Sequence, residues 1–404
     1  MWAMALIDPG CACIGAVLFL LAGQGAAQGP SDLAGILTQV DGLVTLSPAG
    51  REAFRPVRRG VQRQILRPGE VVHVPAGARA TVVCSTETLV SLAGPRDWAL
   101  DAPACGRGVP LPASSYRSLA SFAGRILPRS GALLLELETR NVDVGPGPVL
   151  LSPRDTAVME THPRLVWTRV ADAAEYEIAI RGPVGIAIRL TAGELGCSRG
   201  SGPWQDLDVC SWTSSGRWPA LQPGRPVFLK LGSRPAATAP LRQAQQVYRI
   251  HLLEPSERQG IEEGLRRISI LSMDSVSRLL LAAGTYARAG LSADAIATYD
   301  AALQAHEMPE VRVTLGDLYS TLGLTALAER QYRKVLEGAP DLAERAAAEL
   351  GLGQVTYLST LYGDSRSHFQ RASELYTALG LAAEAEEARA AAARARASAG
   401  NLPP

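Results

Sequence analysis

The pattern of hydrophobic and polar positions changes near residue 254. Before it, short apolar runs alternate with polar residues and are separated by Gly and Pro, as in half-buried strands. After it, Ala, Leu, Glu and Arg dominate, and β-branched residues become rare. The chain is therefore predicted to be multidomain, with two all-β domains followed by an α-helical solenoid.

The first β domain is expected over residues 34–106. Its predicted strands cover residues 42–46, 70–74, 80–84 and 88–92. The series Gly42-x-Val44, Gly69-Glu70-Val71-Val72 and Ala76-Gly77-Ala78 resembles the FecR-type periplasmic domain, although that family has Gly-Asp where this chain has Gly69-Glu70. The resemblance implies a β module of the bacterial cell envelope. The regulatory members of that family carry a cytoplasmic segment and a true spanning helix before this domain. Because the sequence shows neither before residue 34, sensory regulation of the FecR type is expected only as the second alternative function.

A connecting segment is expected over 107–148, and a second β domain over 149–253. The predicted strands of this second domain cover residues 165–167, 174–180, 186–190, 227–231 and 247–253. The motif Pro163-x-Leu165-x-Trp167, followed by Tyr176 and by Leu221-x-Pro223-Gly224, resembles a fibronectin type III or related immunoglobulin-like sandwich. The segment from Gly196 to Trp218 is expected to be an inserted loop.

The strongest internal signal is a repeat in the C-terminal region. Four residues return 33 positions later, so that Tyr286, Gly290, Ala295 and Tyr299 recur as Tyr319, Gly323, Ala328 and Tyr332. Gly316 adds a small residue in a Leu-Gly pair. This pattern resembles the tetratricopeptide repeat, in which small residues let paired helices approach and aromatic residues fill the gaps between repeats. The resemblance implies repeats over 255–398, with a third unit from Leu350-Gly351 and a C-terminal cap helix.

Tetratricopeptide solenoids bind extended peptides or partner helices along a concave groove. Carried over by register, the resemblance implies these partner-binding residues: Leu280, Arg288, Glu310, Val313, Asp317 and Ser320. The alternative for these residues is an ordinary solvated helix surface, or a surface for self-association. The expected function is that of a non-enzymatic adaptor or scaffold that binds a protein or peptide partner in this groove.

The N-terminus indicates export. Residues 11–23 form an apolar run that is too short to span a membrane but fits a signal peptide, and Gly25-Ala26-Ala27 supplies small residues for cleavage, so 1–27 is predicted to be removed. The expected location is periplasmic or secreted, with no transmembrane span after cleavage. An uncleaved anchor is the alternative.

Four cysteines remain after residue 27. Their spacing favours two local disulfides, Cys84–Cys105 and Cys197–Cys210, each within one β domain. The alternative is four buried free thiols. A zinc site is not expected, because the sequence contains no CxxC or HxxxH spacing.

Composition narrows the function classes. The formal net charge of +1 argues against a dedicated nucleic-acid binder. No catalytic or phosphate-binding motif opens a fitting strand-to-helix unit, and the five His are scattered, so neither an enzyme nor a cofactor or metal site is expected.

A glycan or peptidoglycan surface binder acting through the β domains is the first alternative function. It would use the basic stretch Arg55–Arg67 or the tryptophans Trp204, Trp212 and Trp218. The basic stretch is, however, also typical of a solvated loop. The tryptophans are likewise typical of side chains that cap the edge of a sandwich.

Overall fold

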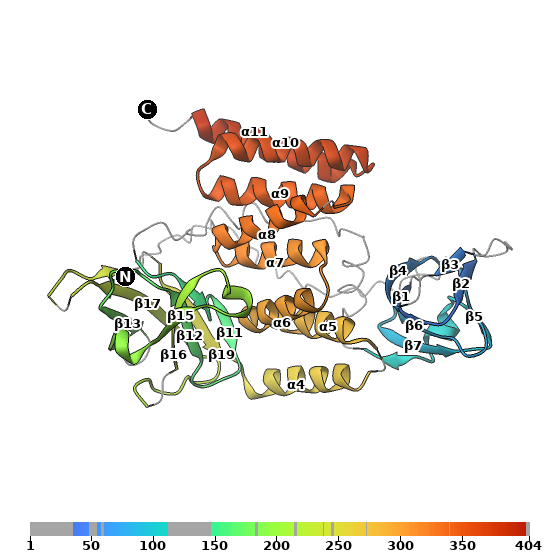
Figure 1. Cartoon of the computed structure of the whole chain (residues 1–404), viewed down its shortest axis with the longest axis horizontal. Helices are drawn as coiled ribbons and strands as arrows, with labels where there is room; N and C mark the ends of the chain where they lie inside the picture. The colour runs from blue at the N-terminus through green and yellow to red at the C-terminus, as the bar shows by residue number, and fades with distance from the viewer. Residues whose placement is uncertain are drawn as a thin grey trace, which may run out of the picture.

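The computed structural model describes residues 35–47, 55–57, 60–111, 147–181, 185–213, 216–236, 238–243, 246–271, 273–338 and 340–400. These residues form two β units and a helical region. Figure 1 shows the β units on opposite sides of the first helices, while the last helices stack beyond both. The predicted signal segment 1–27 and most of the connecting segment 107–148 lie outside the described residues.

The first β unit contains two sheets. Its described elements are β1 (Gly35–Asp41), β2 (Val44–Ser47), β3 (Arg55–Val57), β4 (Gly60–Leu66), β5 (Val71–Val74), β6 (Arg79–Cys84), β7 (Thr88–Ala93), β8 (Arg96–Ala99), α1 (Ala102–Cys105) and β9 (Val109–Pro110). One antiparallel sheet has the order β4-β1-β6-β7-β9, and the other β3-β2-β5-β8. Strand β5 shows why they pack: Val72 and Val74 point into the core, while Val71 and His73 point outward.

The second β unit also contains two sheets around a shared core. Its described elements are β10 (Leu150–Ser152), β11 (Thr156–Val158), β12 (Arg164–Thr168), β13 (Glu175–Arg181), β14 (Ile186–Thr191), η2 (Ala192–Glu194), β15 (Gly196–Arg199), η3 (Gly202–Trp204), β16 (Asp208–Thr213), β17 (Pro226–Arg234), β18 (Arg242–Gln243) and β19 (Tyr248–Leu252). The sheets have the orders β10-β12-β16-β15 and β11-β19-β17-β13-β14, and β18 pairs with β17. Trp167 and Tyr176 are buried between them, with ring centroids 5.6 Å apart.

The segment Gly196–Trp218 is not the inserted loop that the sequence led us to expect. It contains β15 and β16, and β16 is an interior strand that pairs with both β12 and β15. Only the short turn between these strands, which carries η3, projects from the sheet. The expectation failed because β16 buries two adjacent residues, Val209 and Cys210, in different apolar clusters, so the strand lacks the alternation of buried and exposed positions that marks a strand in sequence.

Both disulfides predicted from spacing are present. Cys84 is bonded to Cys105, and Cys197 to Cys210. Cys197 and Cys210 are opposite each other on β15 and β16, so this bond closes the base of the turn that carries Trp204.

The helical region consists of consecutive helices joined by short turns. They are α4 (Pro255–Ser269), α5 (Ser275–Arg288), α6 (Ser292–Ala305), α7 (Pro309–Thr321), α8 (Thr325–Glu337), α9 (Leu342–Leu358), α10 (Tyr362–Ala378) and α11 (Ala382–Gly400). No helix within the described ranges has the length and apolarity required to cross a membrane.

Helices α5–α10 form successive hairpins with matching turns. Gly290 follows α5 and Gly323 follows α7, with φ angles of 70° and 72° in the left-handed region that glycine tolerates. Thr360 follows α9 and takes the same conformation, with φ of 62°. The left-handed turn therefore recurs in a third hairpin although its glycine is absent.

In the third hairpin, the small residue that packs against the aromatic ring is a different glycine from the one expected. An added Cβ at Gly316 would lie 2.4 Å from the ring of Tyr332, and one at Gly353 would lie 2.5 Å from the ring of Phe369. Gly353, Thr360 and Phe369 each follow their counterparts in the second hairpin by 37 residues. The equivalent small residue is therefore Gly353 rather than Gly351, because α9 is longer than α7 and shifts the register.

Candidate functional site

The residues predicted to pack the repeats lie between the helices. Ala295, Tyr299, Ala328 and Tyr332 are buried on α6 and α8, as is Tyr319 on α7, whereas Tyr286 is half-buried. An added Cβ at Gly351 would lie 2.3 Å from Tyr332, whose ring also abuts Gly316. One aromatic ring thus packs against its own hairpin and against the next, which holds successive hairpins together.

Burial changes the acidity of two of these tyrosines. Loss of water around Tyr299 raises the pKa of its hydroxyl to about 12. Burial also raises the pKa of Tyr319, and the nearby Asp300 carboxylate adds to this effect. The Tyr332 hydroxyl instead donates to Asp317 Oδ1 at 2.6 Å, so that Asp317 is tied to the packing between hairpins.

The predicted groove residues differ in their exposure. Leu280, Val313 and Ser320 are at most 8% exposed, so they contribute little surface to a partner in this conformation. Glu310 and Asp317 are half-buried and Arg288 is exposed. The accessible part of the predicted groove is therefore polar and charged, whereas its apolar members belong to the core.

The second β unit forms hydrogen bonds with two equivalent turns of the helical region, the turn between α5 and α6 and the turn between α7 and α8. The Thr156 hydroxyl donates to the carbonyl of Gly290 at 2.5 Å and accepts from the backbone N–H of Ser292 at 2.9 Å. The Arg154 guanidinium donates to the carbonyl of Leu322, which lies in the corresponding turn of the next hairpin. Residues 154–156, which lead from the turn after β10 into the start of β11, thus contact the first two hairpins together.

Arg154 is the central residue of this junction. It is 1% exposed, and it donates to the Leu150 carbonyl at 3.2 Å and to Gln246 Oε1 at 2.7 Å. Its guanidinium also lies 4.9 Å from the centre of the Tyr248 ring, a cation–π contact. A buried arginine with this many partners indicates a permanent contact between the β unit and the helices.

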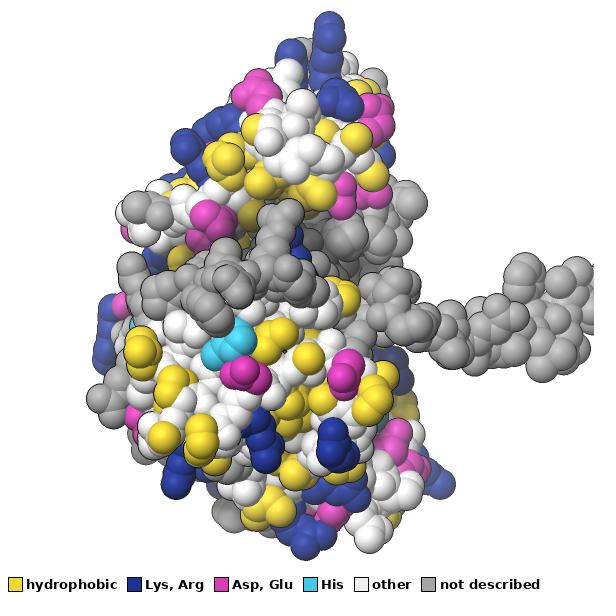
Figure 2. All heavy atoms as spheres, turned by 90° about the vertical axis from the view of Figure 1, so that its right-hand side faces the viewer, with side chains coloured by type: hydrophobic (Ala, Val, Ile, Leu, Met, Phe, Trp, Pro, Cys, Tyr) yellow, Lys and Arg dark blue, Asp and Glu magenta, His cyan; other side chains and the backbone are white. Residues whose placement is uncertain are grey.

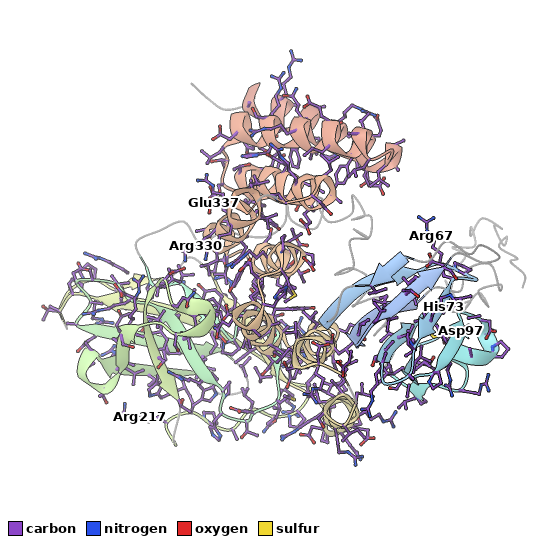
Figure 3. All side chains as sticks on the ribbon, turned by 45° about the vertical axis from the view of Figure 1, so that its right-hand side comes forward. Arg67, His73, Asp97, Arg217, Arg330 and Glu337 are labelled. Atoms are coloured by element: carbon purple, nitrogen blue, oxygen red, sulfur yellow. A yellow bond between two sulfur atoms is a disulfide. The ribbon has the colours of Figure 1, made fainter. Side chains whose placement is uncertain are left out.

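The tryptophans considered as ligand contacts have partners within the chain. Trp204, at the tip of the turn closed by the disulfide, lies 6.0 Å from the Tyr319 ring, and the nearby Asp206 accepts from Arg330 at 3.0 Å. Figure 3 shows Arg330 on the side of the helices that faces this β unit. Trp212 and Trp218 stack on each other at 6.4 Å. The Trp204 turn therefore attaches the β unit to the helices.

The first β unit joins the same core through one sheet. Ile36, Val83 and Leu89 share a continuous apolar cluster with Leu271 and Met273 of the turn between α4 and α5, and with residues of the helices that follow. The helical region is consequently held on two sides by β units, and its last helices, α9–α11, extend away from them (Figure 1).

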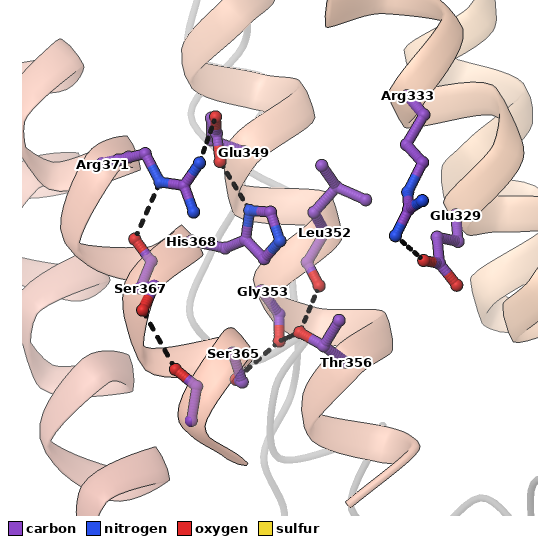
Figure 4. A network of polar contacts seen from close by, with 11 residues as sticks. Glu329, Arg333, Glu349, Leu352, Gly353, Thr356, Ser365, Ser367, His368 and Arg371 are labelled. Atoms are coloured by element: carbon purple, nitrogen blue, oxygen red, sulfur yellow. Dashed lines mark hydrogen bonds and ion pairs between the residues drawn. The ribbon is translucent and has the colours of Figure 1, made fainter. Parts of the chain in front are cut away.

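A buried polar network crosses from α9 to α10. The Glu349 side chain is 4% exposed, His368 Nδ1 lies 2.6 Å from Glu349 Oε2, and Arg371 lies 3.6 Å from its other oxygen. Figure 4 shows this group beside the exposed pair Glu329–Arg333. A carboxylate in this position requires its partners, because an unpaired buried charge is strongly destabilising.

A Ser–His–Asp chain lies on the outer face of the first β unit and was not detectable from sequence spacing. Ser47 Oγ is 2.7 Å from His73 Nε2, and His73 Nδ1 is 2.8 Å from Asp97 Oδ1. Figure 3 shows His73 and Asp97 side by side. Serine hydrolases bury the aspartate and expose the serine. Here Asp97 is 73% exposed and Ser47 is 5% exposed, so the chain is better described as a cross-strand polar contact.

The basic stretch Arg55–Arg67 falls largely outside the described side chains. Arg58 and Arg59 lie outside the described residues, the side chains of Arg55 and Arg63 are likewise outside the description, and Arg67 is exposed. Figure 2 shows basic, acidic and apolar side chains interspersed on the face that the first β unit presents. Among the described residues, no group of three or more His, Cys, Asp or Glu is arranged to hold a metal ion.

Comparisons with known proteins do not assign a family. No protein-family model and no curated protein matches the chain. A solved structure of Astrotactin-2, described as a vertebrate-specific and perforin-like membrane protein involved in neuronal development, aligns with 50% of this chain at 13% identity. The alignment covers 38% of that protein and has a TM-score of 0.20, so the likeness carries no argument about fold or function.

Proposed function

We propose that this protein is an exported, non-enzymatic scaffold of the cell envelope that binds a protein partner through its helical repeats. We further assign the first β unit as FecR-like, the second as fibronectin-like, and the helices as tetratricopeptide repeats. The observation that carries the proposal is the serial hairpin packing, in which Tyr332 lies against Gly316 and Gly351 and left-handed turns recur at Gly290, Gly323 and Thr360. Stacked hairpins of this kind present extended surfaces to macromolecules.

Export is supported by the two disulfides, since such bonds persist in oxidising compartments. The attachment of the second β unit supports a scaffold role, because the contacts of Arg154, Thr156 and Trp204 hold the first hairpins in a fixed arrangement. A preformed surface binds a partner without first losing conformational entropy.

The partner site is assigned to the accessible polar part of the predicted groove, around Arg288, Glu310 and Asp317. The test is affinity capture from envelope extract with the full chain. A charge-swapped variant, Arg288→Glu with Glu310→Arg, is expected to lose the captured partner. The matched control, Arg333→Glu with Glu337→Arg, makes the same exchange on α8 and is expected to retain it. Equal retention by both variants would contradict the assigned site.

A further inference from the structure

A cavity of about 310 Å³ opens where the second β unit meets two successive helical turns. The residues that decide its chemistry are Asp155, Gln246, Val247, Ser292 and Thr321. The first three come from the β unit, Ser292 begins α6 and Thr321 ends α7. The cavity is therefore built by the junction itself, and junctions between structural units are common places for small-molecule sites.

Gln246 supplies a hydrogen-bond donor that the protein leaves unused. The side chain is 8% exposed, and its Oε1 accepts from Arg154 at 2.7 Å. Arginine can only donate, so this bond fixes the amide with its oxygen toward Arg154 and its nitrogen away from it. In the described part of the chain, Gln246 Nε2 has no hydrogen-bond partner. A buried donor without a partner is unfavourable, and an acceptor on a ligand would relieve it.

Asp155 supplies hydrogen-bond acceptors to the cavity. Its Oδ1 accepts from the backbone N–H of Arg249 at 2.8 Å, which leaves Oδ2 to accept a second hydrogen bond. The hydroxyls of Ser292 and Thr321 can each donate and accept. Val247, which is 45% exposed, adds an apolar side to the mouth.

These groups select the charge of a ligand. A carboxylate or phosphate would satisfy Gln246 Nε2 but would be repelled by Asp155. A simple ammonium would satisfy Asp155 but would leave Gln246 Nε2 without an acceptor. A neutral molecule with several hydroxyls satisfies both, because each hydroxyl donates to the carboxylate or accepts from the amide.

We propose that this junction cavity binds a neutral polyhydroxylated ligand, of the size of one sugar ring. The volume lies at the lower end of small-molecule sites, which suits a single ring rather than an oligomer. The ligand would bridge the β unit and the turns that begin α6 and end α7, so its binding would also strengthen the attachment of the helices. None of the residues that line the cavity is among those assigned to the partner surface, Arg288, Glu310 and Asp317.

Saturation-transfer NMR on the oxidised full chain tests the proposal. The probes are the methyl glycosides of glucose, galactose, mannose and N-acetylglucosamine, with acetate and methylammonium as charged comparisons. At least one glycoside is expected to bind saturably and more tightly than either ion. Absence of saturable binding up to about 50 mM of every glycoside would overturn the proposal.

Variants locate the site. Thr321→Val keeps the side-chain volume but removes the hydroxyl, and Gln246→Leu removes the buried donor; each is expected to weaken binding by about tenfold. Thr314→Val makes the same change on the same helix, away from the cavity, and is expected to leave the affinity unchanged. Because Gln246→Leu also removes a partner of Arg154, the Thr321→Val result decides. Equal affinities of Thr321→Val and Thr314→Val would overturn the assignment.

Discussion

At the scale of single residues, the clearest dependence is that of the buried Glu349 carboxylate on its partners. His368 contacts one oxygen at 2.6 Å, and Arg371 approaches the other at 3.6 Å (Figure 4). The Glu329–Arg333 pair nearby also joins a glutamate to a basic side chain, but its side chains are 35% and 63% exposed. Burial, rather than the number of contacts, therefore decides which of the two groups contributes more to stability.

Replacement of His368 by Ala tests this difference. It leaves a buried carboxylate with one distant charged partner, and we expect the local stability of α9 and α10 to fall by about 3 kcal/mol. Arg333→Ala, the control at an exposed pair, is expected to change it by less than about 1 kcal/mol. Amide hydrogen exchange across both helices measures the effect. Similar losses in the two variants would show that burial of Glu349 is unimportant.

Tyr299 gives a prediction about alkaline pH. Burial raises the pKa of its hydroxyl from 10.0 to about 12, so between these values the unfolded chain has lost a proton that the folded chain still holds. Stability is therefore fully present below pH 10 and is lost as the pH rises toward 12, by an amount on the order of 3 kcal/mol. Tyr299→Phe should remove this part of the loss, which denaturant titrations at pH 9 and pH 11 would measure. An unchanged pH dependence in the variant would contradict the assignment.

At the scale of helices and strands, close approach of the two helices within a hairpin depends on a small residue packed against an aromatic ring. Gly316 abuts Tyr332, and Gly353 abuts Phe369, with no room for a Cβ at either glycine. Glycine normally weakens a helix interior, so its presence at these two positions is explained by packing.

Gly316→Ala should therefore destabilise α7 and α8 by about 1–3 kcal/mol, because the added methyl displaces the Tyr332 ring. Gly363→Ala is the matched control in α10, where an added Cβ meets nothing within 4 Å. It should be neutral or stabilising by up to about 1 kcal/mol, since Ala favours helix. Hydrogen exchange of the affected hairpins provides the measurement. Equal effects would rule out the proposed packing.

The elements that were predictable from sequence carry strong local signals. Spacing and composition predicted the turns at Gly290 and Gly323 and both disulfides. They also predicted the strands of the first β unit that lie next to Pro and Gly. The register of the third hairpin did not, because Thr360 takes the turn without a glycine. The chain Ser47–His73–Asp97 was also out of reach, since it depends on the pairing of strands distant in sequence.

At the scale of the whole molecule, the two β units and the helices form one connected body. The junction around Arg154 and the Trp204–Tyr319 contact join the second β unit to the first two hairpins, and the sheet carrying Ile36 and Val83 joins the first β unit to the same core. Such attachment makes the β units a fixed base from which the last helices extend.

Arg154→Leu tests this coupling. The change leaves the Leu322 carbonyl and Gln246 Oε1 without their buried donor, so the β unit and the helices should separate more easily. We expect calorimetry of the variant to show resolved transitions of the β and helical parts, with faster hydrogen exchange in the turn between α7 and α8. Arg217→Leu, on an exposed pair with Glu194, should leave the unfolding profile unchanged. A variant profile identical to that of the native chain would contradict the coupling.

The central claim is that the helical repeats hold a protein partner along the face that carries Arg288. Site-specific photocrosslinking tests it most directly, with a benzophenone amino acid placed at position 288 of the full chain and, as the control, at position 337 on α8. In envelope extract, the account predicts a discrete protein adduct at position 288 that is absent at position 337. Adducts of equal yield at both positions, or no adduct at 288, would contradict it.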